Sequence, residues 1–198
     1  MNDLHAKHDQ AMAAIDAANA ADPRSETFQG EPWPKELLYG HRMSRWLEVL
    51  RPDAPEPLRL AARAQHIRRW EIPRDSYPRD RKGYHQWRTR LYGYHADRTE
   101  EILAELGYDA AIIARVRDLL MKKRIKNDPD MQTLEDVICL VFLENYFADF
   151  AREHDEAKLM TILQRTWGKM SEQGHHAALK LDLPDEARAL VEKALAGG

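Results

Sequence analysis

Val137-Ile-Cys-Leu-Val-Phe-Leu143 is the stretch of sequence that decides the class of fold. A helix through this run is apolar on every side, which is typical of a helix surrounded by other elements. The run lies within a predicted helix over residues 134–154, so we expect that helix to form the buried centre of the domain. No segment alternates between apolar and polar residues for long enough to predict a strand.

Further helices are predicted on both sides of this central one. Apolar residues recur at helical spacing, and prolines and glycines mark where the helices end. The helices are expected at about 4–20, 35–50, 57–70, 83–106, 109–123, 155–170, 171–181 and 184–196, with loops at 23–34 and 71–81. A length of 198 residues fits one domain. The sequence therefore predicts an all-α fold over residues 1–198, a compact single-domain bundle of about seven to nine helices.

The composition excludes several classes of protein. Hydrophobic residues make up 43% of the chain and charged residues 32%, which suits a core under a charged surface rather than a disordered chain. The single cysteine, Cys139, cannot form an internal disulfide. No apolar run approaches the roughly 18 residues of a membrane span, and residues 1–8 lack the apolar core of a secretory signal. We therefore expect a cytoplasmic protein that does not enter the membrane.

The net charge of −3 hides an uneven distribution of arginine. Thirteen arginines lie between Arg42 and Arg98, and with Lys82 they give this stretch 14 basic residues against seven acidic ones, a balance of +7. The rest of the chain then carries a net charge of −10. Guanidinium groups suit bidentate binding of phosphate or carboxylate. Two interpretations stay open: these arginines pair with acidic residues of the same chain, or they face a ligand.

A polar group interrupts the apolar face of the predicted helix that ends near residue 70. On a wheel of ~100° per residue, Gln65 and Arg69 fall among the apolar positions, and His66 lies at the margin. A buried arginine must be paired, because an isolated buried charge is costly. We therefore expect Gln65, His66 and Arg69 to form a polar site, with Arg88 of the next helix nearby. The alternative is a solvated basic cluster at the end of a helix.

Two adjacent carboxylates, Glu135 and Asp136, stand at the head of the central helix. Both point in directions that are otherwise occupied by apolar side chains. As catalytic residues they would orient His66, pair with arginine or bind a metal. For Asp136 a capping role is the alternative, because Thr133 is a suitable N-cap and a carboxylate favours the positive end of a helix.

The order His41, His66, His95 and Asp136 resembles the ligand pattern of the HD-domain phosphohydrolases. That superfamily is all-helical and holds one or two divalent metals with an H…HD…D set of ligands. The resemblance implies an HD-like bundle, a divalent metal as cofactor, these four residues as its ligands, and a hydrolase. The sequence departs from the pattern at Ile67, where that family has an aspartate, and the departure removes a central ligand.

A closer resemblance covers nearly the whole chain, from about residue 15 to about residue 195. The blocks that carry it are Arg63-Ala-Gln-His-Ile-Arg-Arg-Trp-Glu-Ile-Pro-Arg74, Ser76-Tyr-Pro78, Trp87-Arg88, Leu134-Glu-Asp-Val137, Cys139-Leu-Val-Phe-Leu143, Phe147-Ala-Asp-Phe150 and Thr166-Trp-Gly-Lys-Met-Ser171. These long blocks resemble the family described as domain of unknown function 4202. The resemblance brings no reaction with it, so it implies no catalytic residue.

The leading hypothesis is an enzyme, or an enzyme-like site, for a phosphorylated or carboxylated small molecule. Arg69 and Arg88 would hold the anion, with Gln65 beside them. His66 would act as a general acid or base, because an imidazole titrates near neutral pH. A divergent HD-type, metal-dependent hydrolase is one form of this hypothesis.

Two other hypotheses stay open. Residues 42–98 form a non-catalytic interaction module for an acidic partner or nucleic acid, although a near-neutral chain argues against strong nonspecific binding of nucleic acid. Alternatively, Gln65, Arg69, Glu135 and Asp136 form a buried ion-pair network that only stabilises the helices. The sequence does not set the oligomeric state.

Overall fold

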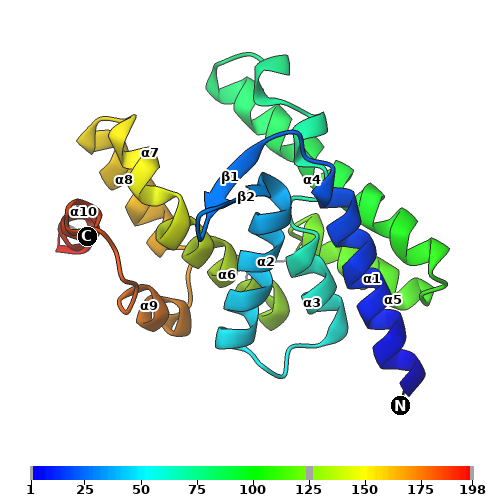
Figure 1. The fold of residues 1–198 in the computed structure, drawn as a ribbon. Coiled ribbons are helices and arrows are strands. Elements are labelled where there is room, and N and C mark those ends of the chain that lie inside the picture. The colour runs from blue at the N-terminus through cyan, green and yellow to red at the C-terminus, as the bar shows by residue number, and fades with distance from the viewer. Residues whose placement is uncertain (1, 124–126, 197–198) are drawn as a thin grey trace.

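The computed structural model describes residues 2–123 and 127–196, and helices dominate it (Figure 1). In chain order the elements are α1 (Asn2–Ala20), β1 (Ser25–Phe28), β2 (Glu31–Pro34), α2 (Lys35–Leu50), α3 (Glu56–Arg63), the short 3-10 helices η1 (Arg69–Glu71) and η2 (Arg74–Ser76), α4 (Arg81–Glu105), α5 (Ala110–Leu120), α6 (Pro129–Asn145), α7 (Phe147–Arg152), α8 (Glu156–Trp167), α9 (Glu172–Ala178) and α10 (Asp185–Ala196). The prediction of an all-α fold is confirmed. None of the described helices has the length and apolar character that a membrane span needs.

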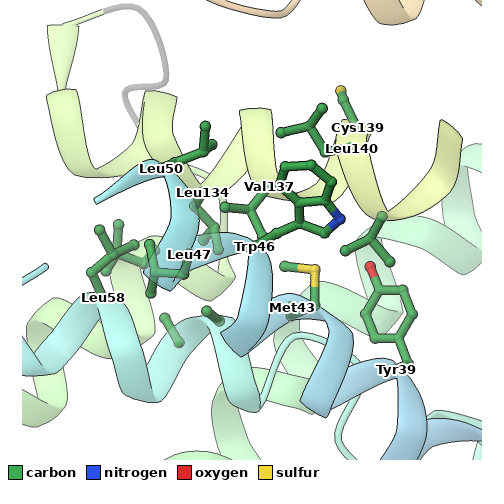
Figure 2. Packing of buried hydrophobic residues seen from close by; sticks show 14 of the residues in the cluster. Tyr39, Met43, Trp46, Leu47, Leu50, Leu58, Leu134, Val137, Cys139 and Leu140 are labelled. Carbon is green, nitrogen blue, oxygen red and sulfur yellow. The ribbon is translucent and has the colours of Figure 1, made fainter. Parts of the chain in front are cut away.

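Helix α6 is the buried centre that its sequence predicts. Its side chains Leu134, Val137 and Leu140 are fully buried. Helix α2 packs against both α6 and α3, and Figure 2 shows Trp46 and Met43 of α2 in the layer between α2 and α6. The bounds differ from the prediction, because α6 begins at residue 129 and ends at residue 145, before the short α7.

Residues 23–34, predicted as a loop, contain a short β-hairpin. Strands β1 and β2 pair antiparallel, with Ser25 opposite Pro34 and Phe28 opposite Glu31. The turn residues Gln29 and Gly30 have φ of 53° and 84°, the left-handed geometry that two-residue hairpin turns require. Strands of four residues are too short for alternation to identify them, which is why the sequence does not predict this hairpin.

The helix predicted over residues 57–70 is also wrong in its second half, because α3 ends at Arg63. The chain then continues in tight turns: Ile67 N donates to Ala64 O, and Arg69 N donates to His66 O. Arg68 adopts a left-handed conformation (φ 50°), and its backbone N donates to Asn19 Oδ1 of α1 at 2.9 Å. The backbone N of Arg68 therefore donates to a residue of α1 instead of to a carbonyl oxygen of the predicted helix. Because residues 65–69 are not α-helical, the positions assigned to them on the helical wheel do not apply.

The turns after α3 bring residues 64–80 onto the first half of the long α4, whose N-terminal end projects beyond α1 and α5 (Figure 1). The indole Nε1 of Trp87 donates to Ile72 O at 2.9 Å, which ties this segment to α4. The fold thus surrounds one volume with four walls: the start of α2, residues 65–79, the first half of α4, and α6.

Candidate functional site

A cavity of about 1020 Å³ lies between these four walls. Its size is that of a site for a small-molecule ligand or cofactor. Eight basic side chains line it, namely Arg24, Lys35, Arg69, Arg74, Arg79, Arg88, Lys122 and Lys169, against the three carboxylates Glu36, Asp75 and Glu135. The lining is therefore strongly cationic, although the whole chain is slightly acidic.

A carboxylate–imidazole pair stands at the centre of the lining. Glu36, in the first turn of α2, has its Oε2 3.1 Å from Nδ1 of His66. Tyr39, one turn further along α2, stacks on the imidazole with ring centroids 3.8 Å apart. On the other side of the ring, Arg69 Nη1 lies 2.6 Å from Nε2 of His66. These three contacts fix both the position and the plane of the imidazole.

The contacts also define the tautomer of His66. Arg69 Nη1 lies 2.6 Å from Nε2 and 3.3 Å from Nδ1, so it does not decide between them, but an ionised carboxylate can only accept hydrogen bonds. The proton of the neutral ring is then on Nδ1, which donates to Glu36. Burial, together with the positive charge of Arg69, lowers the pKa of His66 to about 4. At neutral pH the ring is uncharged, with a lone pair on Nε2 in the cavity wall.

Glu36 is ionised, although it is only 3% exposed. Burial alone would raise its pKa, but the contact with His66 and the charges of Arg69 and Arg24 outweigh burial and lower the pKa to about 2. Arg24 donates to Glu36 Oε1 at 2.7 Å, and the backbone N of Glu36 donates to Asp22 Oδ2 at 3.1 Å. The segment between α1 and β1 therefore positions the carboxylate that orients His66.

A second imidazole lies close to the first. The ring centroids of His66 and His95 are 6.0 Å apart, and both residues line the cavity. Nδ1 of His95 lies 2.8 Å from Ile67 O, and a carbonyl oxygen can only accept, so Nδ1 carries the proton. Burial and the neighbouring His66 lower the pKa of His95 to about 3. His95 is therefore also neutral at physiological pH.

Three cavity arginines are held by aromatic rings instead of carboxylates. The guanidinium of Arg69 lies 4.9 Å from the centroid of Trp87, and that of Arg74 lies 5.9 Å from it. The guanidinium of Arg88 lies 5.5 Å from the ring centroid of Tyr92 and donates to the Tyr92 hydroxyl. Such stacking orients a guanidinium while leaving its charge uncompensated.

The structure divides the thirteen arginines of the 42–98 stretch into two groups. Seven pair with carboxylates of the same chain: Arg42, Arg45, Arg51, Arg59, Arg63, Arg68 and Arg98. Among the side chains that the structure describes, the other six have no carboxylate within 4 Å, and four of these line the cavity: Arg69, Arg74, Arg79 and Arg88. Pairing within the chain therefore accounts for seven of the thirteen arginines, and four of the others line the cavity.

The two adjacent carboxylates of α6 have separate surroundings. Glu135 lines the cavity and pairs with Lys122 at 2.8 Å and Lys169 at 3.6 Å. Asp136 points instead toward the start of α9, where it accepts from the backbone N of Ser171 at 2.8 Å. Neither carboxylate has a hydrogen bond to His66 among the described residues; the carboxylate that orients this ring is Glu36.

Asp136 does not cap its own helix. The N-cap of α6 is Asp128, whose side chain accepts from the backbone N of Asp130 and Met131. Thr133 lies inside the helix and donates to Pro129 O. The capping interpretation of Thr133 with Asp136 is therefore wrong, because the helix begins earlier than the apolar pattern indicates.

The four residues of the predicted metal set are not brought together. His66 and His95 line the cavity, whereas His41 lies 3.4 Å from Asp16 of α1 and packs edge-on against Trp33. Asp136 is bound to the start of α9. In the part of the chain that the structure describes, no group of three or more His, Cys, Asp or Glu side chains could hold a metal ion. The donors present therefore do not fit the metal centre that the HD-like order of residues implies.

The ion-pair network predicted among Gln65, Arg69, Glu135 and Asp136 is not formed either. Arg69 donates to His66, and Glu135 pairs with lysines. Gln65 is 4% exposed and lines the cavity, but its Oε1 has no hydrogen-bond partner among the described residues. Of the site residues that the sequence predicts, Gln65, His66, Arg69, Arg88, His95 and Glu135 line the cavity, whereas His41 and Asp136 do not.

Sequence reasoning missed Glu36, Tyr39 and Lys122. Glu36 is the second residue of α2, and in the first turn of a helix an acidic residue ordinarily complements the helix dipole in solvent. No local signal distinguishes that role from the buried one that the structure shows.

No curated protein and no solved structure is significantly similar to this chain. A family model does match, over residues 9–191, and its description is Domain of unknown function (DUF4202). The match includes every cavity residue named above. The chain therefore belongs to the DUF4202 family.

Proposed function

We propose that the cavity binds a small molecule that carries a phosphate or carboxylate group, and that His66 exchanges a proton with this molecule. One observation carries the proposal. Of the six arginines between residues 42 and 98 without a carboxylate partner in the described chain, four line a single cavity, beside a neutral imidazole. Cationic groups left uncompensated around a cavity favour an anionic ligand.

The roles of the residues follow from their contacts. Arg69, Arg74 and Arg88 bind the anion. Aromatic rings orient their guanidiniums, and each guanidinium has five N–H donors, more than its present contacts use. Arg69 now covers Nε2 of His66. When Arg69 turns its N–H groups to the anion, the lone pair of Nε2 becomes available as a general base. Glu36 holds the ring and stabilises the positive charge that it acquires with the proton.

Two other functions have less support. A metal-dependent hydrolase of HD type needs a ligand cluster that the described residues lack. A module that binds nucleic acid over the whole of residues 42–98 needs a contiguous face of free cations, but seven of the thirteen arginines there are neutralised by carboxylates. The proposed function therefore concerns the cavity and not the outer surface.

Binding of inorganic phosphate and of citrate, measured by isothermal titration calorimetry, tests the proposal. We expect Arg88→Met to weaken binding by at least about 10-fold, since a hydrogen bond to a charged group contributes about 1.5–3 kcal/mol. Arg90→Met is the matched control, because Arg90 lies two residues further along α4 and does not line the cavity. Binding of neither anion by the native protein, or equal losses in the two variants, would contradict the proposal.

A further inference from the structure

Gln65 has a polar group that the protein leaves unused inside the cavity wall. The residue is more than nine-tenths buried, and its Oε1 accepts no hydrogen bond from the described residues. Among the side chains that the structure describes, the other buried polar atoms without a partner belong to His8, Arg42 and Arg98, none of which lines the cavity. Because nearly all buried polar groups in proteins are hydrogen-bonded, this exception requires an explanation.

The position of Gln65 is fixed by the fold. Its backbone N donates to Ala62 O in the turn that ends α3, and its neighbours Ala64 and Ile67 are fully buried. The next residue in the chain is His66, whose ring is held between Glu36 and Arg69. Gln65 therefore belongs to the same turn as the proposed base and lines the same cavity.

The anionic end of the cavity favours phosphate over carboxylate. A carboxylate has two oxygens, which one guanidinium fork can occupy. Arg69, Arg74 and Arg88 provide three guanidiniums around Trp87, Tyr84 and Tyr92. A phosphate monoester has three terminal oxygens and up to two negative charges, so it can accept from all three.

We infer that the ligand is a hydroxylated phosphate monoester: its phosphate binds to Arg69, Arg74 and Arg88, and one of its hydroxyl groups forms a hydrogen bond with the carboxamide of Gln65. The inference rests on the proposed function and narrows its ligand class. A cavity of about 1020 Å³ has room for a polyol or sugar chain that reaches from the arginines to Gln65. Such a ligand brings a hydroxyl group next to His66, the residue that follows Gln65.

Calorimetric titrations with inorganic phosphate, ribose 5-phosphate, glycerol 3-phosphate and free ribose test this inference. For the native protein we expect at least one of the two esters to bind about 10-fold or more tightly than inorganic phosphate, the gain that one well-formed hydrogen bond can give. Gln65→Leu should remove that gain and leave the affinity for inorganic phosphate within about 2-fold of native. Arg88→Met should weaken every phosphate-containing probe.

The outcomes separate the inference from the proposed function. If phosphate binds and depends on Arg88, but neither ester binds more tightly than phosphate, the inference is overturned and the proposed function stands. If Gln65→Leu leaves the ester advantage intact, the inference is equally overturned. If no phosphate compound binds, or free ribose binds as tightly as its phosphate, the proposed function itself fails. Gln65→Met, with an unbranched side chain of similar length, replaces Gln65→Leu if the branched variant does not fold.

Discussion

At the scale of single residues, the site depends on groups whose pKa values the fold lowers from their usual range. His66 and His95 have their pKa lowered to about 4 and about 3, chiefly by burial. Glu36 has its pKa lowered to about 2, because its partners outweigh its burial. Each of these groups binds fewer protons in the folded state than in the unfolded state over the range between its two pKa values. Each therefore stabilises the fold more as the pH rises through that range.

The pH dependence of stability tests the neutral state of His66. Its contribution is complete above pH 6.5 and is lost as the pH falls toward 4. Between pH 7.5 and pH 5, we expect the free energy of unfolding in urea to fall by about 2 kcal/mol for His66 and by a similar amount for His95. His66→Gln should remove about half of that fall.

His176→Gln is the control for this measurement, because His176 is exposed on α9. It should leave the pH dependence as it is in the native protein. A pH dependence that persists unchanged in His66→Gln would show that the fold does not hold His66 in its neutral form, and the proposed general base would lose its basis.

At the scale of elements, the junction between α6 and α9 leaves little room for added atoms. Asp136 of α6 accepts from both the backbone N and the hydroxyl of Ser171, and the same hydroxyl accepts from the backbone N of Gly174 at 3.2 Å. A Cβ at Gly174 would lie 2.8 Å from Cγ and Oδ1 of Asp136. The absence of a side chain at Gly174 is thus what allows α9 to approach α6.

Gly174→Ala should therefore destabilise the protein by about 1–3 kcal/mol, the usual effect of overpacking a rigid contact. Gly93→Ala is the matched control. Gly93 lies in α4, and a Cβ there would meet nothing within 4 Å. That substitution should stabilise the protein by about 0.5–1 kcal/mol through the helix propensity of alanine. Chemical denaturation gives the free energy of unfolding of both variants. Equal changes in that free energy would show that α9 does not pack on α6 in this way.

At the scale of the whole molecule, one cluster of buried hydrophobic residues extends from Ala11 of α1 to Ala194 of α10. Helices α8 and α10 pack on each other, while α9 and α7 join them to α6. Figure 1 shows these C-terminal helices on the side of α6 opposite to α1 and α5. The cluster connects the two sides through α6, and the single domain stays a prediction.

A chain with one continuous core should unfold in one step. We expect urea transitions followed by far-UV and by near-UV circular dichroism to coincide, as they do for two-state domains. Two separated transitions, or a separate early loss of structure in residues 156–196 by hydrogen exchange, would show that α8–α10 form an independent unit. The prediction of a single domain would then be wrong.

The parts of this fold that the sequence predicts are those with local causes. The all-round apolar run in α6 and the helical spacing in α2 are properties of the segments themselves. The end of α3 is different, because Asn19 of α1 takes the backbone N–H of Arg68. The hydrogen bond comes from a residue far away in the chain, so no helical wheel can indicate it.

The same distinction applies to the candidate site. Gln65, His66 and Arg69 could be identified because polar residues stand out within an apolar pattern, even though the helix assumed there is absent. Glu36 could not be identified, because its partners Arg24 and His66 come from other segments. Glu135 and Asp136 are adjacent, and only the packing of α9 decides that one faces the cavity and the other does not.

The fluorescence of Trp87 can report on binding in the cavity. Its indole is buried, anchored to Ile72 O, and has the guanidiniums of Arg69 and Arg74 over its ring. Indole fluorescence responds to charges that move close to the ring. A ligand that draws these two guanidiniums away from Trp87 would change its emission, so occupancy of the site can be followed in the unlabelled protein and used to screen metabolite mixtures.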